Sequence, residues 1–401
     1  MTIDPLRTLD PSLGLVSAST VLVPNEVGLW RTVGLLANGQ TSNGGFSCAV
    51  GAFDVQKRAS ITLGAGEAVE RFALAPAPDD AEYLLADPGS VDQRIDFVTA
   101  GLGRASSLVH DFPWYWATDL LTGEEAHVPA PLVDFSPGVA DPNPWDAFFD
   151  PSPNGAASGS SEGFAQAAGV AEVLERDAFL NAWRLRTALH RFDVEQMPES
   201  VRAAPETRSL LVLLGAALKA GVEPILAFIP GDGAPVETAV CIILSETGPL
   251  RFGAVGLKAA AHPVAALRGA LQEGLQIREL FLARTPSKAT PMAVTDDESR
   301  ADFWTTTEAI AELRKWSDSF RTYRLPTAKR APGVDGLAKY LAARDIRSLW
   351  VSLTHRLPEA IQEMGWVAGK AICPGTIPLT MDETKGLSVV PVPTATAHPL
   401  I

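Results

Sequence analysis

Cysteine is scarce in this 401-residue chain: Cys48, Cys241 and Cys373 lie far apart and form no Cys-x-x-Cys pair. This spacing excludes a disulfide framework and a cysteine zinc site, and the sparse, odd count indicates the reducing cytoplasm, where we place the protein. Histidine is also scarce, with six residues and no His-Glu-x-x-His pattern. We therefore expect buried, inert thiols rather than a catalytic Cys–His pair.

The chain also lacks basic clusters and long apolar runs. It has 33 Lys and Arg against 47 Asp and Glu, a net charge of −14. This balance argues against nucleic acid or an anionic membrane as partner, because both bind clustered Lys and Arg. The sequence contains no run of 18 apolar residues, the length needed to cross a membrane, and its N-terminus has no pattern of a secretory signal. With 46% apolar and 20% charged residues, the composition is that of a soluble globular protein.

Three segments rich in Pro, Gly, Asp or Ser interrupt the chain. Residues 129–161 and 285–301 are predicted to be loops, and 391–401 an extended tail. Between them, helical and strand patterns alternate, which predicts a mixed α/β or α+β fold with a sizeable core.

The individual elements follow from apolar periodicity and capping residues. An aromatic run at 112–116, followed by Thr122-Gly123, indicates a hairpin. Helices are expected from Asp54 to about 72, from Ser160 or Ser161 to about 190, over 210–220 and over 263–283; strands are expected at 224–229, 239–245 and 348–354.

The most informative feature is an internal repeat of the motif Glu-x-x-Glu-Arg. It occurs as Glu67, Glu70 and Arg71, and again in a matching apolar context as Glu172, Glu175 and Arg176. Carboxylates three residues apart share a helical face, about 5–6 Å apart at Cβ, and repel each other mildly. Mg²⁺ prefers such oxygen ligands, and the adjacent arginine can hold a phosphate bidentately. If the two helices face each other, their carboxylates and arginines together form a candidate binding site for metal-bound ATP.

The alternative for these helices is a solvated face with charge pairs inside each helix. One copy of the motif favours that interpretation, and two copies make the readings about equal. Residues 270–278 add Glu273, Gln276 and Arg278 on another amphipathic helix, which read alone is an exposed surface. The small-residue segment 153–161 leads into the second acidic helix and is neither a P-loop nor a dinucleotide fingerprint.

Together these residues resemble the YcaO family. The resemblance rests on the small-residue loop from Asn154, the Glu-x-x-Glu-Arg-Asp of 172–177, the earlier acidic helix at 66–71 and the Glu-x-x-Gln-x-Arg of 273–278. The late segment from Ser348 is similar to the family's closing strands and helix. The likeness divides the chain into an N-terminal extension (1–44), a YcaO-like α+β domain (45–385) and a Pro-containing tail (386–401).

The resemblance implies an enzyme that uses ATP and Mg²⁺ to activate a backbone amide in a ribosomally made precursor peptide. The expected products are azolines above all, with thioamides or macroamidines as alternatives; the expected partners are the precursor peptide, a leader-binding protein and a second copy in a homodimer. It implies metal ligands at Glu67, Glu70, Glu172 and Glu175, with Glu273 as a further candidate. It implies nucleotide contacts at Ser160, Arg71, Arg176, Gln276 and Arg278.

Three positions depart from the family pattern. Phe53, Leu63 and Phe164 stand where the family usually has polar or charged residues, and the tail keeps only part of a Pro-x-Pro-x-Pro ending. These departures support a second hypothesis: a catalytically silent YcaO-like subunit that binds peptide or scaffolds an active partner. An unrelated α/β enzyme is a third.

Overall fold

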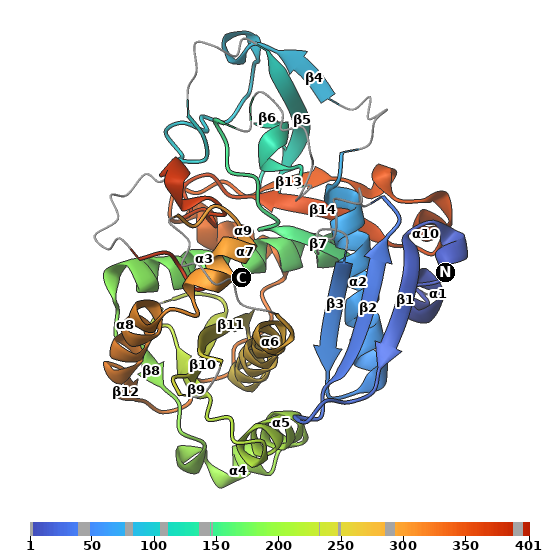
Figure 1. The fold of residues 1–401 in the computed structure, drawn as a ribbon. Helices are drawn as coiled ribbons and strands as arrows, with labels where there is room; N and C mark the ends of the chain where they lie inside the picture. Colours follow the sequence, from blue (N-terminus) through green and yellow to red (C-terminus); the bar gives the residue numbers. More distant parts are fainter. Residues whose placement is uncertain are drawn as a thin grey trace.

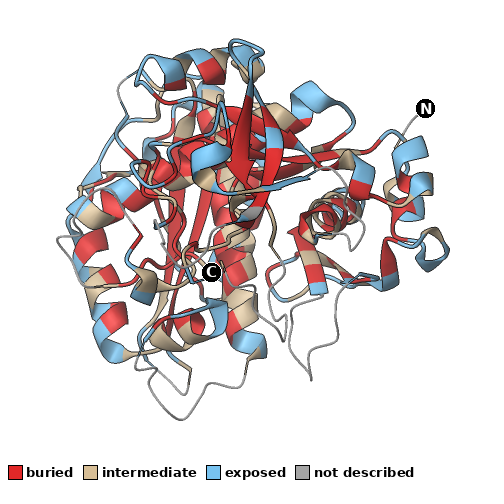
Figure 2. Cartoon of the chain, turned by 90° about the horizontal axis from the view of Figure 1, so that it is seen from above, coloured by how far each residue is buried: buried red, intermediate tan, exposed pale blue. Residues whose placement is uncertain are grey.

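The structure is a computed structural model, and it describes residues 3–38, 49–76, 83–104, 111–135, 145, 147–231, 233–247, 250–284, 293–387 and 396–401. Its strands form three sheets that helices separate and cover (Figure 1). This α+β architecture confirms the predicted fold class. Buried residues gather in the strands and on the inward helix faces (Figure 2).

The first sheet is antiparallel and comes from the N-terminal part of the chain. It has the order β1 (Val16–Leu22), β2 (Trp30–Leu36), β3 (Ala49–Asp54), and helix α2 (Lys57–Leu74) packs on it. The predicted N-terminal extension therefore supplies two strands that continue the sheet of β3. Helix α1 (Pro5–Thr8) lies against α2.

The second sheet carries the most apolar strands of the chain. Its order is β11 (Phe252–Ala260), β10 (Glu237–Ser245), β9 (Ile225–Phe228), β8 (His190–Arg191) and β12 (Arg321–Thr322). Helix α6 (Pro263–Ala283) covers β10 and β11, and its bounds match the prediction. Gly256 lets α6 approach closely, because a Cβ there would lie 2.1 Å from the backbone nitrogen of Gly274.

The third sheet joins distant parts of the chain. Its path is β4 (Tyr83–Ala86), β5 (Phe112–Asp119), β13 (Leu349–Ser352), β14 (Val367–Ile372) and β7 (Ala156–Gly159), and β6 (Glu125–Pro129) pairs with β5. The predicted hairpin is confirmed as β5 and β6, with Gly123 at φ +74°. The prediction that 129–161 is loop is wrong for 156–159, because β14 supplies backbone partners that the local sequence does not show.

Helix α3 (Glu162–Leu185) lies between the second and third sheets, in contact with β7, β14 and β11. Ser161 caps it, and it ends five residues before the predicted limit because Arg186 adopts a left-handed conformation, φ 51°. Helix α2 also contacts β7 and β14, where the Ser158 hydroxyl donates to the Gly66 carbonyl at 2.9 Å. The small side chains of β7 thus bring both acidic helices to one end of the third sheet.

Asp54 is the last residue of β3 rather than the helix cap: its carboxylate accepts the Gln56 N–H, and α2 begins at Lys57. Part of the predicted loop at 285–301 is also helical, as α7, while 285–292 lie outside the described residues. The remaining helices are α4 (Glu199–Arg202), α5 (Arg208–Lys219), α7 (Asp297–Phe303), α8 (Thr307–Asp318), α9 (Gly333–Ala342) and α10 (Glu359–Glu363).

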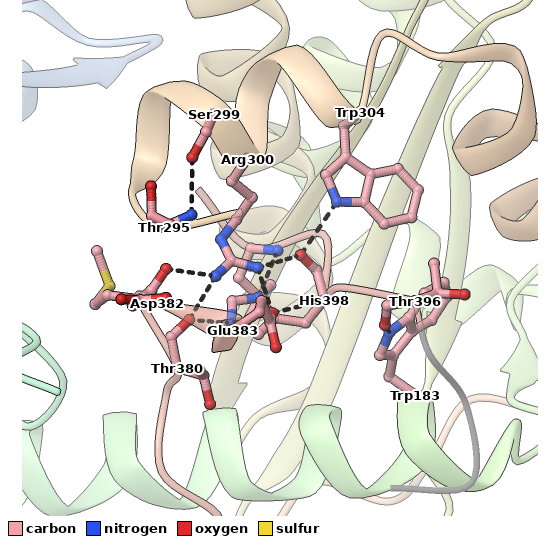
Figure 3. A network of polar contacts seen from close by, with 12 residues as sticks. Trp183, Thr295, Ser299, Arg300, Trp304, Thr380, Asp382, Glu383, Thr396 and His398 are labelled. Carbon is pink, nitrogen blue, oxygen red and sulfur yellow. Dashed lines mark hydrogen bonds and ion pairs between the residues drawn. The ribbon is translucent and has the colours of Figure 1, made fainter. Parts of the chain in front are cut away.

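The end of the chain is held by a buried arginine (Figure 3). The Arg300 side chain has no exposed surface and donates to the carbonyls of Thr380 (2.6 Å), Met381 (3.0 Å) and His398 (3.0 Å). It also pairs with Glu383 at 2.7 Å, and Trp304 donates to the same His398 carbonyl. The described end of the predicted tail, 396–401, is therefore docked on the body, while 388–395 lie outside the described residues.

We expect Arg300→Met to lower the free energy of unfolding by about 3 kcal/mol, because a fully buried guanidinium gives up its hydrogen bonds to three carbonyls and its ion pair with Glu383. Urea denaturation measures this loss. Arg314→Met is the matched control: Arg314 and Glu246 are both more than a third exposed, so removing that pair should cost less than about 1 kcal/mol. Equal losses in the two variants would contradict the anchoring role of Arg300.

Candidate nucleotide and metal site

The two Glu-x-x-Glu-Arg motifs have the same local geometry in α2 and α3. Arg71 Nε lies 2.8 Å from Glu67 Oε1, and Arg176 Nε lies 3.3 Å from Glu172 Oε1. In each helix the arginine therefore pairs with the glutamate four residues earlier. These ion pairs are expected for a solvated helix face as well as for a phosphate site. The residues around each pair distinguish the two interpretations.

The carboxylates of the two helices face each other. Burial raises the pKa of Glu70 well above its usual value, and the negative charges of Glu67 and Glu172 raise it further. Glu172 belongs to the other helix, so α2 and α3 bring their acidic faces together. Glu70 is half-buried, so it does not lie on a freely solvated helix face.

The arginines also converge. The pKa of Arg71 is raised by Glu67 and Glu70 of its own helix and by Glu172 of the other, against the opposing effect of burial. Arg176 lies among Glu172, Glu273 and Glu175, which raise its pKa in the same way. Two guanidinium groups thus stand beside several carboxylates, the pairing of charges that a metal-bound phosphate needs.

A third element, formed by α6 and β11, closes one end of the cluster. Glu273 of α6 accepts the backbone N–H of Leu257 at 2.5 Å, and Glu175 of α3 accepts that of Ala259. Burial raises the pKa of Glu273 to about 7, and the nearby Glu175 contributes to the rise. Glu273, predicted as a further candidate ligand, therefore lies with the acidic residues of α3.

The remaining predicted nucleotide contacts lie differently. Arg278 pairs with Glu26 at 2.6 Å and with Glu279 at 2.7 Å, so it is bound to the segment between β1 and β2. Arg278 follows Glu273 by five residues and therefore lies on another face of α6, so the helix reaches the cluster and this guanidinium does not. Gln276 is half-buried on α6, and Ser160 is exposed between β7 and α3.

The three departures from the family pattern have different environments. Phe53 is buried in the large core, and its carbonyl accepts the side-chain N–H of Gln272 at 2.6 Å. Leu63 and Phe164 are exposed, by 47% and 62%, on α2 and in the first turn of α3. Phe53 is therefore a packing residue, whereas Leu63 and Phe164 place apolar surface on the two helices that carry the acidic motifs.

Sequence reasoning missed two lysines beside the cluster. Lys258 of β11 lies with its Nζ 4.0 Å from Glu175 Oε2. Lys370 of β14 is fully buried and donates to the carbonyls of Ser152 (2.6 Å) and Val133 (3.2 Å). Each is the single charged residue of an otherwise apolar strand, and this was the available signal.

The donors at this site suit Mg²⁺ by their chemistry, since they are hard carboxylate oxygens with arginines at hand for phosphate. The crowded Glu70 supports this, because within the described part of the chain its carboxylate makes no ion pair. As arranged here, however, no three His, Cys, Asp or Glu side chains among those residues are close enough to hold one ion. Glu67 and Glu172 point to their arginines, so coordination requires these two side chains to turn.

Fold and site together define an α+β protein in which two equivalent helices join their acidic faces at the end of a sheet. The family model described as YcaO cyclodehydratase, ATP- and Mg²⁺-binding, matches residues 54–377. The chain belongs to the YcaO family, as its motifs predicted.

Solved structures share the fold at low sequence identity. The YcaO of Methanopyrus kandleri, bound with AMPPCP and Mg²⁺, is 17% identical with a TM-score of 0.68, over 98% of this chain and 96% of that one. A heterocyclase in complex with substrate and cofactor has a TM-score of 0.69 at 16% identity, over 93% of this chain and 52% of that one. The E. coli microcin synthetase McbBCD complex with pro-MccB17 bound gives 0.61 and 16%, over 89% and 87%. No curated protein matches the chain.

The predictions about cysteines, membrane crossing and cellular location are tested by the structure to different extents. Cys241 and Cys373 are free and buried, as expected, and burial raises the pKa of the Cys373 thiol to about 12; Cys48 lies outside the described residues. In the described ranges, no helix has the length and apolar character needed to cross a membrane. The cytoplasmic location stays a prediction.

Proposed function

We propose that this protein binds ATP with Mg²⁺ and activates a backbone amide of a ribosomally synthesised precursor peptide. The observation that carries the proposal is that Glu70 and Arg71 of α2 lie within electrostatic range of Glu172 and Arg176 of α3. Family membership supports the chemistry, because the matching model describes ATP and Mg²⁺ binding.

Each side chain has a defined task in this proposal. Glu67, Glu70, Glu172 and Glu175 are the candidate metal ligands, with Glu273 beside them, and bound Mg²⁺ would supply charge neutralisation at the phosphates. Arg71 and Arg176 would leave their glutamate partners and hold phosphate oxygens, which positions the γ-phosphoryl group. Ser160, Gln276 and Arg278 remain candidate nucleotide contacts, Arg278 only if its pair with Glu26 opens.

The proposed reaction class is phosphorylation of the amide oxygen followed by loss of phosphate. Azoline formation is the preferred outcome: a Cys, Ser or Thr side chain attacks the preceding amide carbonyl, the amide oxygen takes the γ-phosphoryl group of ATP, and phosphate then leaves. Thioamide and macroamidine products follow from other nucleophiles. A precursor peptide, a leader-binding protein and a homodimer are the proposed partners; the microcin synthetase complex with pro-MccB17 is a structural precedent.

The alternative is a YcaO-like subunit that does not turn over ATP and binds peptide or scaffolds an active partner. The exposed Leu63 and Phe164 favour it, because they put apolar surface where the family resemblance implies polar groups. Losing two or three charged hydrogen bonds would weaken nucleotide binding by several kcal/mol, at about 1.5–3 kcal/mol each.

Isothermal titration calorimetry with AMPPCP and Mg²⁺ separates the two functions. We expect saturable binding that disappears when EDTA removes the metal, because the acidic side chains of the cluster bind the nucleotide through the ion. The same titration without nucleotide is the control for Mg²⁺ alone. Absence of binding at millimolar AMPPCP would reject the proposal of an ATP-using enzyme and leave the proposal of a YcaO-like subunit.

A further inference from the structure

Strand β11 holds two carboxylates of the cluster along its outer edge, the buried Glu175 and the half-buried Glu273. It is the outermost strand of its sheet, and no strand among the described residues pairs with its outer edge. The N–H groups of Leu257 and Ala259 donate instead to Glu273 and Glu175. Between these two donors stands Lys258, whose ammonium lies 4.0 Å from Glu175 Oε2.

The aliphatic part of the Lys258 side chain packs against α6 at Gly269. A Cβ on Gly269 would lie 2.5 Å from Cγ of Lys258, 2.8 Å from its Cβ and 2.9 Å from its Cδ. The stem therefore lies flat on the bare backbone of α6, and any side chain at 269 would displace it. Although 54% of the lysine side chain is exposed, its path directs the ammonium to Glu175, which is only 7% exposed.

A cation beside Glu175 and Glu273 balances their negative charge. Glu175 and Glu273 come from two helices, and the single positive charge of Arg176 is shared with Glu172. A further positive charge beside these two carboxylates reduces their mutual repulsion and favours their ionised forms. A divalent ion between them would lie within a few ångströms of the Lys258 ammonium and be repelled by it.

We propose that the Lys258 ammonium is the resident cation of the Glu175–Glu273 pair and fills the position that a divalent ion would otherwise take. The inference rests on the proposed function, and it narrows the metal ligands to Glu67, Glu70 and Glu172. The protein then needs fewer divalent ions for each nucleotide than the five carboxylates of the cluster suggest.

The test counts ions rather than turnover. The full chain is dialysed to equilibrium against Mn²⁺ and AMPPCP, and bound manganese and bound nucleotide are measured separately by atomic absorption and by absorbance. We expect Lys258→Met to bind one more Mn²⁺ per bound nucleotide than the wild type. Lys258→Arg keeps the positive charge and should retain the wild-type ratio.

Lys315→Met, which removes an exposed lysine of α8, is the matched control and should also keep the wild-type ratio. Urea denaturation confirms that each variant is folded. Equal nonzero ratios of manganese to nucleotide in the wild type and in Lys258→Met would overturn this inference and leave the proposed function standing. No manganese on any protein would overturn the proposed function as well.

Discussion

Replacing Glu70 by glutamine is expected to reduce ATP-dependent phosphate release about 100- to 1,000-fold, the range found when one preorganised electrostatic group is removed from an active site. Glutamine keeps the shape of the side chain but removes the negative charge that would bind Mg²⁺. A coupled assay for released phosphate, with the precursor peptide present, measures the effect.

The same substitution should not destabilise the protein. The pKa of Glu70 is raised by burial, Glu67 and Glu172, so this carboxyl group costs stability once the pH rises above its unfolded value. At pH 8 the variant should therefore unfold at the same or a higher urea concentration than the wild type. Glu308→Gln, an exposed change on α8, is the control for both measurements. Full activity of Glu70→Gln would show that Glu70 is not a metal ligand.

A second large effect is expected from the buried Lys370. Burial lowers its pKa to about 7 from an ordinary value of 10.5, despite the nearby Asp134. Between these two pH values the unfolded chain binds a proton that the folded chain does not, so stability falls as the pH drops from 10.5 towards 7 and not further below. At about 1.4 kcal/mol per pH unit, the whole loss is on the order of 5 kcal/mol.

Lys370→Met removes this titration. We expect the free energy of unfolding of the wild type, minus that of the variant, to grow by several kcal/mol between pH 7 and pH 10. Urea denaturation at both pH values measures the difference. Lys219→Met, at an exposed position of α5, should leave it constant. A constant difference for Lys370→Met as well would show that Lys370 is protonated throughout.

The site was predictable to the extent that its chemistry repeats in the sequence. Glu67, Glu70 and Arg71 share their spacing with Glu172, Glu175 and Arg176, and helical periodicity alone places each triplet on one face. That the two faces meet depends on β7, a four-residue strand of small side chains inside a segment predicted to be loop. β14 selects this strand by pairing with residues about 210 positions earlier, and no local pattern encodes that contact.

The limits of the prediction are clearest at α6 and in the tail. Periodicity gave the bounds of α6, yet the rotation of the helix directs Arg278 to Glu26 and leaves Glu273 at the cluster. In the tail, proline content indicated an extended segment, whereas Arg300 and Trp304 dock its last residues through backbone carbonyls. Backbone acceptors are identical in every sequence, so such docking leaves no compositional signal.

By itself the sequence determined that two helices each carry an acidic motif on one face, because residues three and four apart on a helix are neighbours in any fold. The family and its α+β fold follow from the resemblance of these motifs to the YcaO family, not from their helical spacing. Only the tertiary structure decided that the carboxylates of α2 and α3 lie close together, that Arg278 is engaged elsewhere, and that Lys258 and Lys370 stand beside the cluster. These features depend on contacts between residues far apart in the chain, and the free energy of each contact is set by the packing that surrounds it.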